Sequence, residues 1–148
     1  MLIQLLIGSL LICITVIIEV FFIGMATQFI TRNSSWVTDG RHIWRFMVEL
    51  VAVVFWLLVA LVIAIWMWAV TFLILDIFQT LEKSLYFSIV SFTTLGFGDI
   101  IIGQKWRLLS GFSAANGLIM FSLTTAFLIE FITKIRLHYQ QGDQDDDD

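Results

Sequence analysis

The sequence predicts an all-α integral membrane protein with three transmembrane helices and one re-entrant half-helix. The 148 residues are 59% hydrophobic with a mean hydropathy of +0.96, which is more apolar than a soluble core accounts for. Three apolar runs are each long enough to cross a bilayer. A shorter apolar segment lies between the last two runs and covers only part of that thickness.

The first apolar run extends from Leu2 to Ile30, which at ~1.5 Å per residue is enough to cross a hydrocarbon core of ~30 Å. We therefore assign residues 1–31 to an extra N-terminal transmembrane helix. A cleaved signal peptide is the alternative, but the start MLIQLLIG has no basic region and the run is longer than the apolar part of a signal. Residues 32–45 form a polar connection to the next span.

The second span is predicted at 46–75 and the third at 107–135, which contains the apolar run 108–132. Basic residues are more frequent in the first connection and after the third span than between the last two spans. This bias predicts an N-terminus outside the cell and a cytoplasmic location for both the connection at 32–45 and the C-terminus, and we expect the plasma membrane. The acidic tail at 136–148 ends in DQDDDD, which we expect to be disordered and solvated.

The half-helix is predicted at residues 84–93, SLYFSIVSFT, which form a helix only about 15 Å long. A segment of that length can enter the membrane and turn back, but it cannot cross. Non-helical backbone at membrane depth is tolerated only where protein buries it or water lines it. The chain that follows the half-helix is therefore expected to face a pore or a cavity.

The motif TTLGFGD at residues 93–99 has the pattern that a carbonyl-lined ion site requires. Successive backbone carbonyls can replace the hydration shell of a cation when they point toward one axis. That arrangement needs backbone angles of alternating handedness, which glycine adopts without a Cβ penalty. Gly96 and Gly98 stand at alternate positions, so we expect Leu95 and Phe97 to turn their side chains into the protein.

TTLGFGD resembles the selectivity-filter signature of potassium channels, whose common form is TTVGYGD, and its Leu and Phe variants are similar to those of two-pore-domain and small bacterial channels. The resemblance covers the half-helix, the filter and the third span, about a third of the chain. It implies a pore domain at 46–135, with an outer helix at 46–75, a pore helix at 84–93, a filter at 94–99 and an inner helix at 107–135.

The resemblance further implies passive, potassium-selective conduction, with K⁺ as the permeant ion and without a cofactor or an enzymatic activity. One filter strand cannot surround an ion, so four copies of the chain are expected around an axis as a homotetramer. Membrane lipids are the other expected partners, and no nucleic-acid partner is expected.

The site residues follow from the positions that match the family motif. K⁺ is expected at the carbonyls of Thr94, Leu95, Gly96 and Phe97, with the Thr94 hydroxyl at the innermost site. The implied ion-binding residues of the filter are Thr94, Leu95, Gly96, Phe97 and Gly98. The residues implied to support the filter or form its outer mouth are Thr93, Asp99, Tyr86 and Phe87.

In the third span, GLIMFSLTTA is similar to the inner helix of the family, with Gly117 at the hinge position. Leu118, Phe121 and Thr125 fall at i, i+3 and i+7 on one helix face and are expected to line the water-filled cavity below the filter. Ordinary helix packing is the alternative for that face. Asn116 lies off it, which favours a hydrogen bond to another helix over contact with ions.

Two positions depart from the family pattern. Val90 stands where relatives often carry a carboxylate behind the filter, and Phe97 replaces a tyrosine whose hydroxyl usually bonds to an aromatic residue of the half-helix. Phe87 matches that aromatic residue and cannot donate a hydrogen bond either. Ring packing is therefore expected to hold the filter, with Tyr86 as the hydrogen-bond donor to Asp99.

Two other functions are compatible with parts of the sequence. GFGD also matches the GxGD motif of intramembrane aspartyl proteases, in which Asp99 would pair with Asp76. Those enzymes have more spans and a proline-containing motif, whereas this chain has no proline. A non-conducting structural or assembly protein is the other alternative, because the first span has no recognisable role.

Glu19 is the one ionisable side chain deep inside the first span, where such a group marks a site or a partner. We favour a protonated or hydrogen-bonded contact between helices, with pH sensing as the alternative. No helix carries Arg or Lys at every third position, so the sequence does not predict a voltage sensor.

Overall fold

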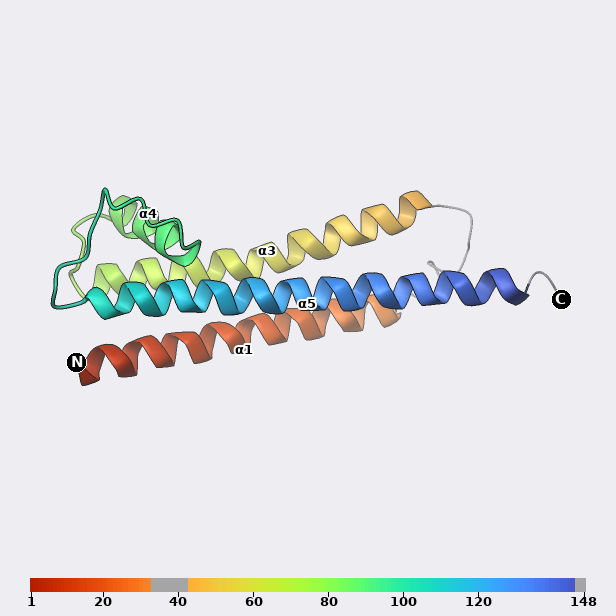
Figure 1. The fold of residues 1–148 in the computed structure, drawn as a ribbon, viewed down its shortest axis with the longest axis horizontal. Coiled ribbons are helices and arrows are strands. Elements are labelled where there is room, and N and C mark those ends of the chain that lie inside the picture. The colour runs from red at the N-terminus through yellow and green to blue at the C-terminus, as the bar shows by residue number, and fades with distance from the viewer. Residues whose placement is uncertain (33–42, 146–148) are drawn as a thin grey trace.

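The computed structural model of the chain describes residues 1–32 and 43–145. The described residues form four helices without a strand: α1 (Leu2–Arg32), α3 (Ile43–Ile74), α4 (Leu81–Phe92) and α5 (Arg107–Asp145) (Figure 1). The all-helical fold expected from the sequence is confirmed for this part of the chain.

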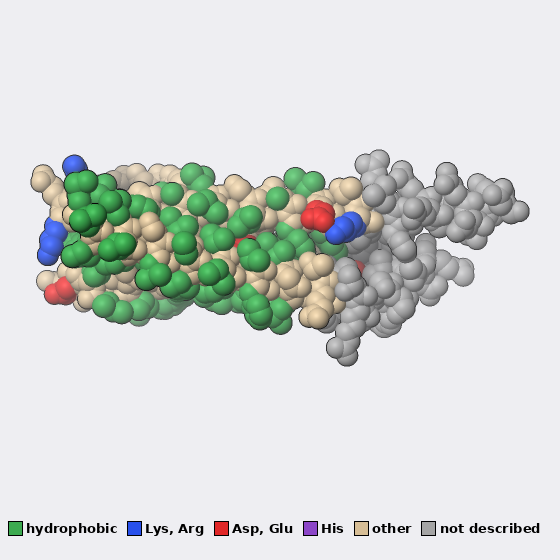
Figure 2. Space-filling view, turned by 90° about the horizontal axis from the view of Figure 1, so that it is seen from below, with side chains coloured by type: hydrophobic (Ala, Val, Ile, Leu, Met, Phe, Trp, Pro, Cys, Tyr) green, Lys and Arg blue, Asp and Glu red, His purple; other side chains and the backbone are tan. Residues whose placement is uncertain are grey.

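The three long helices contain the three expected spans. Segments Leu2–Gln28, Met47–Ile74 and Arg107–Lys134 are long and apolar enough to cross a membrane. Apolar side chains cover most of the face shown in Figure 2, and charged side chains gather toward its two ends. Large apolar residues such as Leu6, Phe21 and Phe55 are exposed, which suits a surface in contact with lipid.

The helices run side by side, with α1 and α5 in one direction and α3 in the other (Figure 1). The short helix α4 lies at the end where α1 begins, α3 ends and α5 begins, hereafter the α4 end. Helix α1 packs against both α3 and α5, and α4 also contacts α3 and α5. The additional first span is therefore packed against the other two long helices rather than attached to them by a linker alone.

An aromatic cluster holds α4 against the end of α3. The ring of Phe72 makes edge contacts with Phe78 at 6.3 Å and with Phe87 at 5.5 Å, and Phe78 lies 5.1 Å from Phe87. Trp68 adds a fourth ring, 5.7 Å from Phe72. Each such ring pair is worth about 0.5–1.5 kcal/mol beyond its buried area, so the cluster holds α4 in place against α3.

The chain reverses direction between α3 and α4 at Asp76, which adopts a positive φ of 55°. Helix α4 then begins at Leu81, whereas the sequence analysis placed its start at residue 84. The N-cap explains the three additional residues, because Thr80 Oγ1 accepts a hydrogen bond from the Lys83 amide at 3.4 Å. Glu82 in the first turn adds a favourable charge at the positive end of the helix dipole.

Helix α5 continues to Asp145, ten residues beyond the end predicted at 135. The prediction of a disordered acidic run is therefore wrong for residues 143–145, and residues 146–148 lie outside the described residues. Good helix formers such as Leu and Gln, and the absence of proline, allow the helix to continue in spite of its charge. Of the predicted connection at 32–45, residues 33–42 also lie outside the described part.

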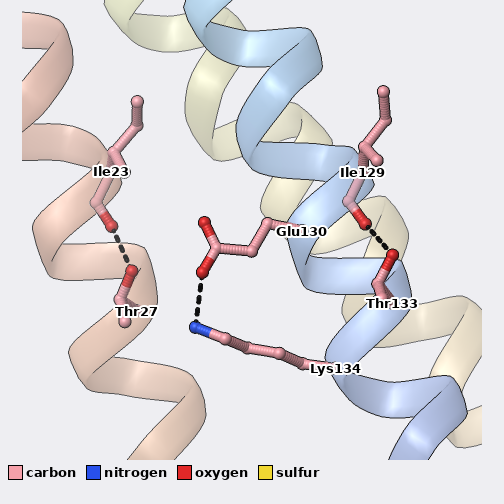
Figure 3. A network of polar contacts seen from close by, with 6 residues as sticks. All are labelled: Ile23, Thr27, Ile129, Glu130, Thr133 and Lys134. Atoms are coloured by element: carbon pink, nitrogen blue, oxygen red, sulfur yellow. Dashed lines mark hydrogen bonds and ion pairs between the residues drawn. The ribbon is translucent and has the colours of Figure 1, made fainter.

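At the end opposite α4, some of the polar side chains are satisfied locally (Figure 3). Thr27 of α1 and Thr133 of α5 donate to carbonyls four residues earlier in their own helices, at 2.9 and 2.8 Å. Glu130 and Lys134 form an exposed ion pair with an Nζ–Oε1 distance of 2.6 Å. Exposed pairs of this i, i+4 kind contribute only about 0.3–0.5 kcal/mol, so this pair has little influence on the fold.

Candidate functional site

The segment that follows α4 returns to the end from which α4 started. Helix α4 slants from the α4 end toward the middle of the bundle, and the chain then runs back to the start of α5 (Figure 1). Its 12 residues give a length of about 18 Å, which is shorter than a membrane core. This is the re-entrant geometry that the sequence predicted, and it leaves residues 94–99, hereafter the filter segment, as non-helical backbone.

Small residues bring α5 close to the C-terminal end of α4. A Cβ added to Gly117 would lie 1.8 Å from the backbone oxygen of Phe92, so only glycine fits there. Nearby, Ser91 Oγ donates to the backbone oxygen of Ser110 at 2.9 Å. These contacts give Gly117 a packing function, and its assignment as a hinge stays a prediction.

Backbone angles alternate along the filter segment. The φ angles are +60° at Thr94, +57° at Gly96 and +79° at Gly98, whereas Leu95 and Phe97 do not have positive values. This is the alternating handedness that the two glycines predicted. Thr94 shares it despite its Cβ, at a strain of about 1–3 kcal/mol, and the sequence analysis did not foresee this.

The backbone amides of the filter segment are bonded to the last turn of α4. Thr94 N–H donates to Ser91 O at 2.9 Å, and the amides of Leu95 and Gly96 both donate to Val90 O, at 3.0 and 3.3 Å. By contrast, the carbonyls of residues 94–98 accept no hydrogen bond from the residues that the structure describes. The segment therefore offers a row of neutral oxygen acceptors that a cation can use.

Side chains of the filter segment lie on the surface of the single chain. Leu95 is 59% exposed and Phe97 is 67% exposed. Within one chain, Phe87 packs against Phe72 and Phe78. The expected ring packing that holds the filter stays a prediction for the assembled channel. Inward packing of Leu95 and Phe97 would require another copy of the chain.

Tyr86 anchors the C-terminal end of the filter segment. Its hydroxyl donates to Asp99 Oδ2 at 2.7 Å, which confirms the predicted donor. This hydrogen bond lowers the pKa of Asp99 below its ordinary value and raises the pKa of Tyr86. The side-chain partner of Asp99 is thus Tyr86 and not Asp76, the partner that a protease would need.

Thr93 and Val90 complete the support behind the filter segment. Thr93 is the C-cap residue of α4, and its hydroxyl donates to Ile89 O at 2.7 Å. Val90 is buried and presents an apolar side chain. Its carbonyl, which accepts the two amides described above, is the part of this residue that positions the filter segment.

The predicted cavity face of α5 is open in the single chain. Leu118, Phe121 and Thr125 are all exposed, and Thr125 Oγ1 donates to Phe121 O at 2.7 Å. Phe121 also makes an edge contact with Phe92 of α4, with centroids 6.0 Å apart. The three residues therefore share one uncovered face below the end of α4, and their contact with a cavity stays a prediction.

Polar contacts join α1 to α5. Thr15 Oγ1 donates to Asn116 Oδ1 at 3.0 Å, and Thr124 Oγ1 donates to Glu19 Oε1 at 2.6 Å. These two contacts confirm the predicted hydrogen bonds between helices for Asn116 and Glu19, which are both fully buried. The sequence did not reveal their partners, although the buried residues of α1 recur at a helical spacing. That series consists of Gln4, Gly8, Leu11, Thr15 and Glu19.

Near the α4 end, two further contacts secure α1. The Gln4 side-chain amide donates to the backbone oxygen of Lys105, just before α5. A Cβ on Gly8 would lie 2.5 Å from the ring of Phe112, so glycine permits the close approach of α1 and α5.

No group of three or more side chains able to hold a metal ion occurs among the described residues.

Comparison with known proteins gives one family match for this chain. Residues 15–134 match the sequence model of a family described as ion channel. The matched region includes most of α1, all of α3 and α4, and the filter segment. No curated protein and no solved structure matched the chain.

Proposed function

We propose that this chain, which belongs to an ion channel family, is a potassium-selective channel through which K⁺ crosses the membrane passively. The observation that carries the proposal is the filter segment itself. Positive φ angles at Thr94, Gly96 and Gly98 alternate along a backbone whose carbonyls have no protein donor among the described residues.

The proposed chemistry is the exchange of hydration water for backbone oxygens. The carbonyls of Thr94, Leu95, Gly96 and Phe97 would coordinate K⁺ in successive rings, with the Thr94 hydroxyl at the inner end and Gly98 and Asp99 at the outer mouth. Neutral carbonyls suit a weakly hydrated monovalent cation that must bind and leave quickly. K⁺ is the transported ion, and the proposal includes no cofactor and no enzymatic step.

A homotetramer is part of the proposal because one filter segment presents oxygens from one side only. The exposure of Leu95 and Phe97 supports it, since both are large apolar side chains beside a polar backbone. The open face formed by Leu118, Phe121 and Thr125 supports it as well, because four such faces would surround a cavity below the filter.

The proposed orientation places the α4 end outside the cell and the C-terminal end of α5 in the cytoplasm. The N-terminus of α1 lies at the same end as the filter segment (Figure 1). The bias of basic residues toward the opposite end supports a cytoplasmic location for that end. The proposed location is the plasma membrane, with lipids and other copies of the chain as partners.

Ion flux into liposomes that contain the purified protein tests this proposal. We expect rapid uptake of K⁺ or Rb⁺ down a gradient and little uptake of Na⁺. Liposomes with the Gly96→Ala variant, reconstituted at the same density, control for leakage. Equal uptake of K⁺ and Na⁺, or uptake that the variant leaves unchanged, would remove the proposed role of the filter segment.

A further inference from the structure

A pocket of about 480 Å³ lies between α1 and α3, at the end of the bundle opposite α4. Its volume falls within the range of about 300–1,000 Å³ that small-molecule sites occupy. The residues that line it are Met25, Ala26 and Gln28 of α1 and Glu49, Ala52, Val53 and Trp56 of α3. None of these residues belongs to the filter segment or to the open face of α5.

Small side chains and one fixed aromatic pair explain why the pocket exists. Ala26 and Ala52 leave space between the two helices, because neither side chain reaches across it. Deeper in the membrane, Trp56 stacks on Phe22 with centroids 4.8 Å apart, and its Nε1 donates to Phe22 O at 3.1 Å. Trp56 is therefore held in place and forms a rigid apolar floor.

The pocket is polar at one end and apolar at the other. Glu49 stands seven residues before Trp56 on the same face of α3, which separates them by about 10 Å along the helix axis. Since the apolar span of α3 begins at Met47, Glu49 lies near the membrane surface. Its half-buried carboxylate makes no hydrogen bond or ion pair with the residues that the structure describes.

We propose that this pocket binds an amphipathic amine, with its ammonium group on Glu49 and its hydrocarbon chain extending along Ala26, Ala52 and Val53 to Trp56. A half-buried carboxylate that has no partner among the described residues favours a cation that brings its own apolar body. The Met25 side chain is flexible enough to adapt to such a chain. A carboxylate or phosphate headgroup would be repelled by Glu49. The site does not depend on which ion the filter segment selects.

Calorimetric titration of the protein in a neutral detergent with dodecylamine near pH 7 tests the site. We expect saturable binding to the unaltered chain, and binding weaker by at least about tenfold for Glu49→Gln, which removes the charge. Glu49→Asp, which retains the charge, should retain binding. Glu130→Gln is the matched control, because it removes an exposed carboxylate at the same end without touching the pocket (Figure 3).

A second variant tests the apolar part of the pocket. Ala52→Leu fills the space between the helices and should abolish saturable binding of dodecylamine while thermal stability is retained. If Glu49→Gln does not fold, Ala52→Leu still tests whether dodecylamine binds in this pocket. Dodecanol has the same hydrocarbon chain as dodecylamine but carries no charge. It should therefore bind with equal affinity to the unaltered protein and to Glu49→Gln. Equal affinity of the unaltered chain for dodecanol and dodecylamine, or full binding to Ala52→Leu, would overturn the proposal.

Discussion

At the scale of single residues, the proposed chemistry belongs to the backbone of the filter segment. A Cβ added at Gly96 or Gly98 would meet nothing within 4 Å in the single chain. The choice of residue at these positions is therefore limited by the positive φ angles, +57° at Gly96 and +79° at Gly98. An L-residue held at such an angle is strained by about 1–3 kcal/mol. A substitution should relax the backbone and turn carbonyls away from the axis without disturbing the long helices.

We predict that Gly96→Ala and Gly98→Ala each abolish selective K⁺ conduction while the protein still assembles. Liposome flux measures conduction, and size-exclusion chromatography measures assembly. Gly103→Ala is the control, because Gly103 also has open space around it and does not share the positive φ. Selective conduction by either filter variant at the level of the unaltered chain would contradict the assigned role of these glycines.

The hydrogen bond between Tyr86 and Asp99 predicts a dependence on pH. It lowers the pKa of Asp99 below its ordinary value of 3.8. A lowered pKa in the folded state stabilises the fold above the unfolded value, and this contribution is lost as the pH falls through the folded value. Tyr86→Phe should therefore reduce thermal stability at pH 7, and the difference from the unaltered chain should shrink below about pH 4.

Thermal unfolding in detergent between pH 3 and pH 8 measures that difference. Tyr86→Phe removes a single hydroxyl from a partly exposed ring, so packing changes little. If the difference between the two proteins were the same at pH 3 and pH 7, the ionised carboxylate of Asp99 would not be the partner that matters.

At the scale of helices, the contact between α4 and α5 depends on one glycine. A Cβ at Gly117 would overlap the backbone oxygen of Phe92, whereas a Cβ at Gly111 in the same helix would meet nothing within 4 Å. We predict that Gly117→Ala destabilises the protein by about 1–3 kcal/mol through overpacking. Gly111→Ala should be neutral or stabilising, by up to about 1 kcal/mol, because alanine favours a helix.

Unfolding curves of the two alanine variants compare these effects directly. They also separate packing from a hinge. A residue that acts only as a hinge would change the opening of the channel without lowering stability. Equal stability of Gly117→Ala and Gly111→Ala would therefore remove the packing function that the structure gives to Gly117.

The sequence predicts a helix or a turn well where residues inside that segment determine its structure. The spans and the half-helix follow from hydropathy and length, and the alternating backbone follows from Gly96 and Gly98. The start of α4 was missed because its N-cap, Thr80, lies in a stretch that hydropathy treats as a loop. The acidic charge after residue 135 favours an end of α5 there, whereas the helix propensity of the residues that follow extends α5 to Asp145.

The contacts of α1 with α5 show what a single sequence leaves open. Asn116 and Glu19 were expected to bond to another helix, but their partners Thr15 and Thr124 lie 101 and 105 residues away. Such pairs depend on which helix faces meet, and that is decided by packing over the whole bundle. The positive φ of Thr94 likewise results from the bonding of the filter amides to the last turn of α4.

At the scale of the whole molecule, the proposed homotetramer would cover two surfaces that one chain leaves open. The filter segment and the open face of α5 are uncovered, although both carry large apolar side chains. We predict that an amine-reactive crosslinker in mild detergent yields a ladder that ends at four subunits, with the exposed Lys83 and Lys105 as reactive groups at the α4 end. A ladder that ends at two would contradict the fourfold axis.

Selection of K⁺ over Na⁺ by the filter segment is the central claim, and the reversal potential tests it most directly. With a mainly K⁺ solution on one side of a planar bilayer and, on the other, a mainly Na⁺ solution of equal total concentration that contains some K⁺, the current through the purified protein should reverse close to the K⁺ equilibrium potential. This result is expected because, in the proposed function, the neutral carbonyls of residues 94–97 would replace the hydration shell of K⁺. A reversal potential near zero, with both ions equally permeant, would contradict the account.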